Sequence, residues 1–119
     1  MESKLYFYRA FVSKVYDGDT ITVDIDLGLN VNLKGEKVRL FGINAPEMRG
    51  QEKQKGKVSR DFLRSLVLKK NIYIKTIKDK KGKYGRYIAE VFVNDKLSDE
   101  LINVNRLMVK KGFAVEKNY

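Results

Sequence analysis

An arginine and a glutamate stand eight positions apart in the stretch Val38 to Glu47, which reads Val-Arg-Leu-Phe-Gly-Ile-Asn-Ala-Pro-Glu. The stretch begins with a strand-like pattern around Arg39, and it holds Pro46, the only proline of the chain. A proline fixes its own φ and pushes the preceding residue toward extended geometry, so Glu47 should lie on a stiff loop past a strand end. A guanidinium and a carboxylate on a rigid support suit chemistry at a phosphate group. The alternative is a solvated glutamate and an arginine lying along a sheet.

The composition narrows the chemistry that such residues could perform. The chain of 119 residues contains no cysteine and no histidine. Disulfides, zinc–thiolate sites and thiol nucleophiles are therefore excluded, and so is the commonest general base. Acid–base chemistry must rest on Asp, Glu, Lys or Tyr, and a metal site must be built from oxygen ligands.

The positive charge is concentrated in the middle of the chain. The formal net charge is +10, and the segment from Arg49 to Arg86 holds fourteen Lys or Arg against three acids. The segment before it, up to Met48, has six basic and seven acidic residues. A basic middle beside a segment with carboxylates predicts a polyanionic partner and a separate place where acids gather. The alternative is a solubilising lysine surface.

The first 45 residues have the pattern of a three-stranded antiparallel meander. Residues 5–16 are rich in aromatic and β-branched side chains, and an Asp-Gly turn follows at residues 17–18. Apolar residues then alternate with polar ones from Thr20 to Leu27, as in a half-buried strand. A polar connection over residues 28–37 precedes the strand that begins at Val38.

The rest of the chain predicts a helix, two strands and a helical tail. Residues 51–69 carry an apolar stripe at helical spacing, with a basic stripe beside it. Strands are expected over residues 71–78 and 86–93, with Ile72, Ile74 and Thr76 on one side of the first. One or two short helices follow, ending near Gly112, and residues 115–119 form a loose tail. The apolar stripe comprises Val58, Phe62, Leu63, Leu66 and Val67, and the core contacts expected in the tail are Leu101, Leu107, Met108 and Val109.

These elements predict one domain over residues 1–119, with its core at about residues 5–114. Five strands with a helix between the third and the fourth match the OB-fold, a small, partly open barrel that commonly binds oligonucleotides. We therefore expect an α+β, mainly β fold: a five-stranded barrel with about three helices.

Three motifs have an order and a spacing that are far more specific than each alone. They are Asp-Gly-Asp-Thr at residues 17–20, the stretch from Arg39 to Glu47, and Lys-Tyr-Gly-Arg at residues 83–86. Together with Val-Lys-Lys-Gly-Phe-Ala at residues 109–114, they resemble the staphylococcal nuclease (thermonuclease) family. The resemblance extends from about Phe11 to Ala114 and implies a metal-dependent phosphodiesterase, with Ca²⁺ as its usual ion.

The resemblance also implies a role for individual residues. Glu47 would activate or orient the attacking water, while Arg39 and Arg86 would grip the phosphate and stabilise the five-coordinate transition state. Planar arginines that meet two phosphate oxygens at once suit this role. The metal ligands would be Asp19, Asn44 and the backbone carbonyl of Ala45. Tyr84 would lie beside the nucleotide. The charge pattern, independently of the resemblance, adds Lys83 and the basic helix face of Lys53, Lys57, Arg60 and Arg64 as expected nucleic-acid contacts.

Asn44 departs from the family pattern, which has an aspartate at this position. A neutral amide oxygen can coordinate Ca²⁺, but with one charge fewer the affinity should fall. Asp17, Asp24 or Asp26 could compensate. Strand parity favours Asp17, because Asp17 and Asp19 share the parity of the core residues.

The main prediction is a nuclease that hydrolyses DNA, RNA or both, and two alternatives remain open. One is a non-catalytic nucleic-acid-binding module on the same fold, which Asn44 favours. The other is a subunit-contact domain without a nucleic-acid partner. Residues 1–8 lack the pattern of a signal peptide, and no apolar run is long enough to span a membrane. We expect a cytoplasmic monomer with no membrane partner, or a mature secreted form.

Overall fold

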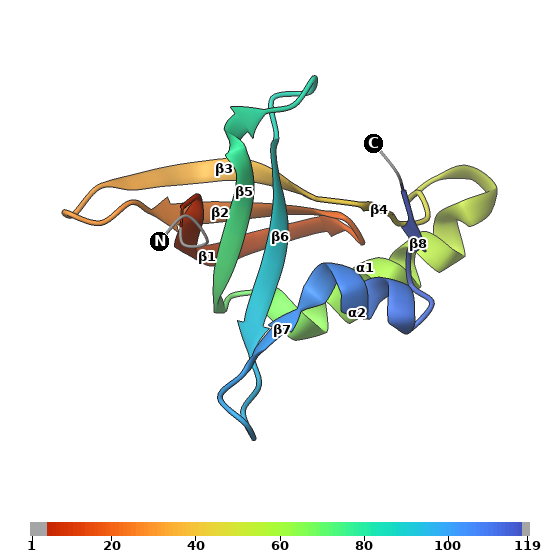
Figure 1. Ribbon diagram of the computed structural model, residues 1–119. Helices are drawn as coiled ribbons and strands as arrows, with labels where there is room; N and C mark the ends of the chain where they lie inside the picture. Colours follow the sequence, from red (N-terminus) through yellow and green to blue (C-terminus); the bar gives the residue numbers. More distant parts are fainter. Residues whose placement is uncertain (1–4, 118–119) are drawn as a thin grey trace.

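The computed structural model describes residues 5–117. Strands dominate, and two α-helices and one short 3₁₀ turn cover one side of them (Figure 1). In chain order the elements are β1 (Phe7–Asp17), β2 (Thr20–Asp26), β3 (Asn32–Leu40), β4 (Ile43–Asn44), the 3₁₀ turn (Gly50–Glu52), α1 (Lys53–Val67), β5 (Asn71–Lys81), β6 (Tyr87–Asn94), β7 (Leu101–Asn103), α2 (Val104–Lys110) and β8 (Val115–Glu116).

The main sheet closes on itself as a barrel. Its strand order is β3-β2-β1-β5-β6-β7, and a further pairing joins β3 to β6 in parallel. β1, β2 and β3 form the predicted antiparallel meander. Five strands therefore close the barrel while β7 extends one end of β6. The expected mainly β OB-fold is confirmed.

The barrel interior is filled by the residues that alternate inward along the strands. Side chains of β2 such as Ile21 and Val23 are fully buried, and so is Ile74 of β5. The apolar interior continues onto α1 and α2 through Leu63, Val67, Val104 and Met108. Leu27 is 41% exposed because β2 ends at Asp26, so the predicted alternation stops one residue earlier.

Helix α1 turns most of the predicted stripe inward, because Leu63 and Val67 are buried and Phe62 and Leu66 pack against the core, but the face is displaced in its first turns. Val58, expected in the apolar stripe, is 55% exposed, and the buried face is Gly56, Ser59, Leu63 and Val67. Gly56 and Ser59 are small because the backbone of other segments lies against the helix at these positions. The Ser59 hydroxyl donates to the carbonyl oxygen of Phe113 at 2.8 Å. The first turn of α1 therefore rests on loops rather than on the apolar core.

Helix α2 ends as the glycine predicts. Gly112 has φ +82°, its N–H donates to the carbonyl of Val109, and the N–H of Phe113 donates to that of Met108. This pair of bonds is a Schellman motif. Leu101, an expected core contact, is instead 44% exposed, because it lies in β7 at the edge of the sheet.

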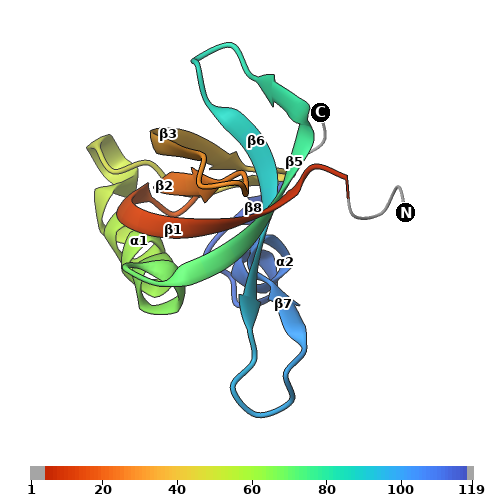
Figure 2. The same ribbon diagram turned by 90° about the vertical axis from the view of Figure 1, so that its left-hand side faces the viewer.

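Three segments differ from the sequence prediction. β3 starts at Asn32, within the expected connection, and its first part is exposed, which hides the alternation of a half-buried strand. The segment before α2 forms a β6–β7 hairpin, which Figure 2 shows projecting opposite to the β5–β6 turn. Val115 and Glu116, expected in a loose tail, form β8 and pair with β4. Residues 118–119 lie outside the described part of the chain.

Neither helix is both long and apolar enough to cross a membrane, a finding that covers residues 5–117.

Candidate active site

Arg39 is a buried, charged residue next to the C-terminal end of β3. The residue is only 9% exposed, and its guanidinium has three partners. Nη1 donates to the carbonyl of Leu40 at 3.0 Å, Nη2 donates to Oδ1 of Asn44 at 2.5 Å, and Nη2 lies 3.4 Å from Oδ2 of Asp19. Because these contacts engage both Nη atoms, the guanidinium plane is held in one orientation.

Asp19 connects the turn after β1 to the two arginines. Its Oδ2 accepts from the backbone N–H of Ala45 at 2.8 Å, and its Oδ1 accepts from the hydroxyl of Thr20 at 3.1 Å. The same hydroxyl accepts a long hydrogen bond, 3.4 Å, from Nη1 of Arg86. Sequence reasoning did not single out Thr20, although it directly follows Asp19 in the first motif. One carboxylate thus links Arg39 directly and Arg86 through Thr20.

Asp17 lies beside Asp19 in the same turn. Its Oδ1 accepts from the backbone N–H of Asp19 at 3.0 Å. Burial, the hydrogen bond between the Asp17 and Asp19 side chains and the charge of Asp19 raise the pKa of the Asp17 carboxyl to about 6, although the backbone N–H of Asp19 and the charge of Arg39 lower it. Two carboxylates in a partly buried place resist full ionisation together, and a cation would relieve this repulsion.

Glu47 lies on the loop after β4. Helix α1 packs against this loop and sets its position. Its side chain is 66% exposed, and Oε2 lies 3.6 Å from Nε of Arg49. A Cβ added at Gly56 would lie 2.1 Å from the carbonyl oxygen of Glu47, so the helix and this loop approach as closely as a glycine allows. Gly18 has the same role in the first turn, where an added Cβ would lie 1.9 Å from Oγ of Ser59.

One cavity brings together most of the predicted catalytic and metal-binding residues. Its walls come from the turn after β1, the end of β3, the β4 loop and the segment after α2. The predicted residues that line it are Asp17, Asp19, Arg39, Asn44, Ala45 and Glu47. Glu52 and Lys55 also line it, and no sequence pattern marked them.

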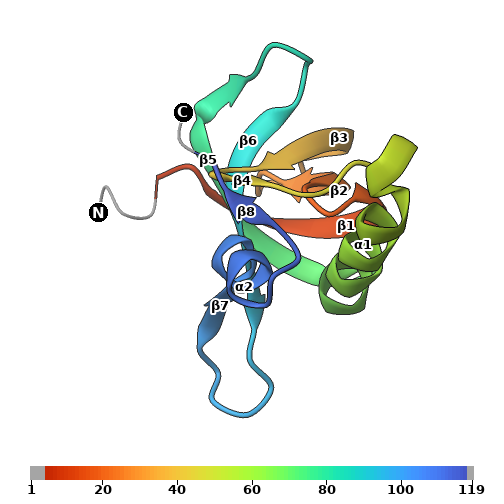
Figure 3. The ribbon, with the colours of Figure 1, turned by 90° about the vertical axis from the view of Figure 1, so that its right-hand side faces the viewer.

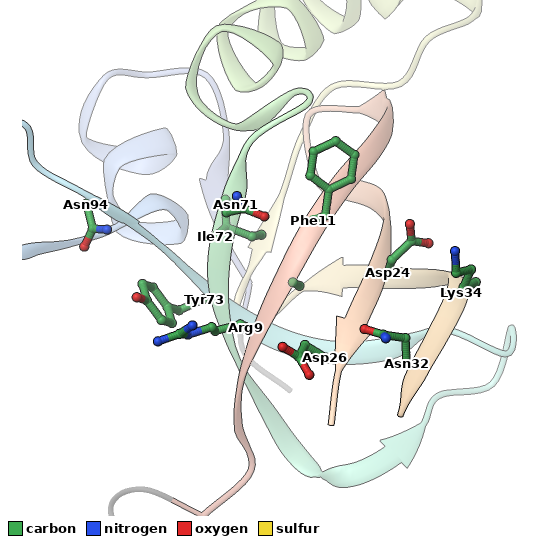
Figure 4. A pocket seen from close by; sticks show the side chains of 11 residues that line it. Arg9, Phe11, Asp24, Asp26, Asn32, Lys34, Asn71, Ile72, Tyr73 and Asn94 are labelled. Carbon is green, nitrogen blue, oxygen red and sulfur yellow. The ribbon is translucent and has the colours of Figure 1, made fainter. Parts of the chain in front are cut away.

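Asp24 and Asp26 do not belong to this cavity. They accept hydrogen bonds from the backbone N–H groups of Gly35 and Gly28. They also line a groove elsewhere on the barrel, where Figure 4 shows them on β2 beside Asn32 and Lys34 on β3. Of the three aspartates that could compensate for Asn44, the structure therefore places only Asp17 with Asp19.

The predicted nucleic-acid contacts separate into two groups. Tyr84 is 72% exposed, and the Cζ atom of Arg86 lies 5.3 Å from its ring centroid, with the Lys83 ammonium at 5.7 Å. Arg60 and Arg64 line a second groove together with Tyr84, Arg86 and Glu47. Lys53 and Lys57 line neither this groove nor the cavity.

The side chains around Asp19 suit a hard cation by chemical type. The carboxylates of Asp17 and Asp19 and the amide oxygen of Asn44 are oxygen donors, which Ca²⁺ prefers. Across residues 5–117, no group of three acidic side chains is close enough to form a ligand set by itself. The donors therefore fit such an ion in kind, and water or backbone oxygen would have to complete its coordination.

The sequence from residue 37 onward identifies the family of the chain. The model of the staphylococcal nuclease homologue family matches residues 37–119, which include Arg39, Asn44, Glu47 and Arg86. The chain belongs to the staphylococcal nuclease family. A thermonuclease of Staphylococcus intermedius is 32% identical over 111 residues, covering 91% of this chain and 59% of its own length.

Two further proteins similar to this chain come from organisms other than staphylococci. An uncharacterized protein of Methanocaldococcus jannaschii is 31% identical over 130 residues, covering 90% of this chain and 58% of its own length. One of Bacillus anthracis is 34% identical over 112 residues, covering 87% and 45% respectively. The chain thus spans about half the length of the curated relatives it matches.

Proposed function

We propose that the chain is a nuclease that hydrolyses phosphodiester bonds of DNA, RNA or both. One observation carries the proposal. A buried arginine, Arg39, is oriented by Asp19 and Asn44 toward a cavity that Glu47 also lines, and Thr20 connects Asp19 to a second arginine, Arg86. The names of its staphylococcal relatives point to the same activity.

The two arginines bind the phosphate and stabilise the charge that develops on it. In phosphodiester hydrolysis, negative charge builds up on the equatorial oxygens as water adds to phosphorus. A guanidinium meets two such oxygens with parallel N–H bonds and stays charged at any working pH. Arg39 donates from a fixed position, whereas Arg86 can adjust, because its guanidinium makes one long hydrogen bond among the described residues and otherwise lies against the exposed ring of Tyr84.

Glu47 takes the proton of the attacking water. The chain has no histidine, so a carboxylate is the natural base. Glu47 is exposed enough to reach water, and its only ion pair within residues 5–117 is the 3.6 Å contact to Arg49, whose side chain is still more exposed. The tight approach of Gly56 to its backbone holds it at the mouth of the cavity.

A calcium ion would be held by Asp19 and Asn44, with Asp17 and the Ala45 carbonyl as further ligands. The ion would act as a Lewis acid toward the phosphate and lower the pKa of bound water. Asn44 already gives its amide oxygen to Arg39, so it both orients that arginine and lacks the charge that an aspartate would add. We therefore expect weak binding of Ca²⁺.

Cleavage of a labelled DNA strand and of the matching RNA strand, with Ca²⁺ and with a chelator, tests the proposal. Cleavage should require the ion and collapse in Glu47→Gln. Glu100→Gln, an exposed glutamate on the β6–β7 hairpin, is the matched control and should cut normally. Cleavage that persists in Glu47→Gln would contradict the role of Glu47, and persistence in the chelator would contradict the metal requirement.

Asn44 also favours a second candidate function, a nucleic-acid-binding module that does not cut. Under this alternative the wild type binds DNA without cleaving it, and Asn44→Asp, which restores the charge, gains activity. Under the nuclease proposal both proteins cut, and Asn44→Asp needs less Ca²⁺ for the same rate, by roughly fivefold or more, since one added charge close to the ion is worth at least about 1 kcal/mol.

A further inference from the structure

A long groove leads away from the proposed active site, between α1 and the outer face of β1–β3. Figure 3 shows α1 beside these strands, with the β5–β6 turn on their other side. Glu47 and Arg86 line the end that meets the active site, and Arg60 and Arg64 contribute the α1 wall. The floor is a row of cross-strand neighbours, Lys14 on β1, Thr22 on β2 and Lys37 on β3.

The groove is strongly positive. Seven cations line it, against the single carboxylate of Glu47. Arg60 and Arg64 share one anion, Asp61, at 3.2 Å and 3.8 Å. Within residues 5–117, no carboxylate forms an ion pair with Lys14 or Lys37. Among these residues, Lys14 and Lys37 thus have no carboxylate to neutralise them, which is the arrangement expected of a surface that binds a polyanion.

The groove that Asp24 and Asp26 line, elsewhere on the barrel, serves as a comparison. The groove of Figure 4 is lined by two cations, Arg9 and Lys34, and by two carboxylates, Asp24 and Asp26. Of these two grooves, the one beside α1 therefore attracts a polyanion and the balanced one does not. The net charge of the whole chain does not by itself distinguish the two surfaces, but this local balance does.

Two exposed tyrosines lie along the positive groove. Tyr16, at the end of β1, is 70% exposed, and Tyr84, in the turn before β6, is 72% exposed. Exposed aromatic rings in a basic groove are platforms for nucleobases, and a base must be unpaired before its face can stack on such a ring. Tyr16 lies outside the three sequence motifs and has no role in the proposed cleavage.

We propose that this groove binds a single-stranded stretch of nucleic acid next to the cleaved bond. The phosphates lie along the Lys14–Lys37 row and the α1 arginines, and a base stacks on Tyr16. The position of the cleaved bond rests on the proposed nuclease function, whereas the binding itself requires no catalysis.

Fluorescence anisotropy with a labelled oligothymidylate of about 12 nucleotides, within the range of an OB-fold site, measures this binding. A chelator prevents cleavage during the titration. Lys37→Glu is compared with Lys34→Glu, because both lysines are exposed on β3 and the two changes alter the net charge equally. We expect Lys37→Glu to weaken binding severalfold and to lower the salt slope by at least about 0.7. Lys34→Glu should leave the slope unchanged, and equal losses in both variants would overturn the proposal.

Tyr16→Ala tests the stacking contact and the preference for a single strand. Loss of a stacked base should weaken binding of the oligothymidylate by roughly fivefold or more. Tyr16→Phe should restore it, because the ring face is kept. A fully paired hairpin should show no such loss. An equal loss on the hairpin, or none on the single strand, would refute the stacking role of Tyr16.

Cleavage assays separate this proposal from the proposed function. A dinucleotide is too short to occupy the groove, so Lys37→Glu should raise the KM of the long strand more than that of the dinucleotide. If the wild type cuts neither substrate but the anisotropy results are as expected, the nuclease function fails and the groove stands. If the wild type cuts both and Lys37→Glu binds and cuts normally, the groove fails and the function stands.

Discussion

Arg39 and Arg86 differ in how firmly the fold holds them. Arg39 is buried with three partners, whereas Arg86 is half-buried with one long hydrogen bond to Thr20 among the described residues. A lysine keeps the charge at either position but cannot form the paired N–H contacts of a guanidinium.

We therefore expect the two Arg→Lys substitutions to affect activity alike and stability differently. Each should lower the cleavage rate by about 10²–10³, the usual cost of losing a donor to transition-state charge. Arg39→Lys should also lower the free energy of unfolding by about 1–3 kcal/mol, because hydrogen bonds to Asn44 and Leu40 are lost. Arg86→Lys should unfold like the wild type. Urea denaturation with parallel rate measurements checks both, and equal stability losses would contradict the difference in anchoring.

Asp17 gives the metal-free protein a pH dependence of stability. Its pKa is raised from 3.8 to about 6 in the folded state, so folding favours the protonated form. The stabilisation is complete below pH 3.8 and is lost as the pH rises through about 6. Because the group is partly exposed, we expect the loss to be about 1–2 kcal/mol.

Asp17→Asn should remove this dependence and make the metal-free protein more stable above pH 6. Denaturation at several pH values, in the presence of a chelator, measures the effect. Asp26→Asn, an exposed aspartate of β2 outside the cavity, should keep the wild-type profile. An unchanged profile in Asp17→Asn would show that another group titrates.

For single residues, the sequence predicts which side chains lie together but not which hydrogen bonds they form. The motifs place Asp19, Arg39 and Glu47 in one cavity, and the structure agrees. The bond from Arg39 to the Asn44 amide depends on the path of the β4 loop, and so does the bond from the Ala45 N–H to Asp19. No local pattern in a single sequence encodes such a path.

At the scale of elements, α1 supports the loop that carries Glu47. Its first turn meets the backbone of Glu47 at Gly56, where only a hydrogen atom fits. The helix position and the loop position are therefore coupled, although they are separate elements.

Gly56→Ala should show this coupling through the sign of its effect. In an unhindered helix, Gly→Ala stabilises by about 0.5–1 kcal/mol. Here the added Cβ would lie 2.1 Å from a backbone oxygen, so we expect a loss of about 1–3 kcal/mol and reduced cleavage as Glu47 shifts. Gln54→Ala, an exposed change in the same turn, is the control for helix propensity. A stabilised, fully active Gly56→Ala would contradict the coupling.

The elements whose apolar residues recur with a clear period were predictable from the sequence, and the elements without such a period were not. β2 alternates inside and outside, and its sequence shows this directly. β4 and β8 have two residues each, too few for any periodicity, and they form only because they pair with each other. Val58 was misplaced because the buried face of α1 begins with Gly56 and Ser59, which pack against backbone and carry no apolar signal.

At the scale of the whole molecule, the net charge of +10 has two opposite consequences. Repulsion among like charges destabilises the compact state, whereas the same charges attract nucleic acid. Salt screens both, since the Debye length falls to about 10 Å at 0.1 M ionic strength.

Adding salt should therefore stabilise the protein while weakening its complex with nucleic acid. We expect a higher Tm, by about 4 °C for each kcal/mol of repulsion that is screened. The affinity for an oligonucleotide should fall over the same range. Differential scanning fluorimetry and anisotropy at matched salt concentrations test this, and a Tm that falls with salt would show that attractive ion pairs outweigh repulsion.

The parallel pairing of β3 with β6 has a consequence for the time at which the proposed nuclease would become active. Arg39 lies opposite Ile88 in this pairing, and Arg86 directly precedes β6, so both proposed phosphate contacts depend on one contact between distant parts of the chain. A ribosome delivers Asp19, Arg39 and Glu47 first and completes the pair of arginines only when β6 emerges. A nascent chain arrested at Gly85 should cut nothing, so the messenger RNA being translated would meet an active site only after the barrel has closed.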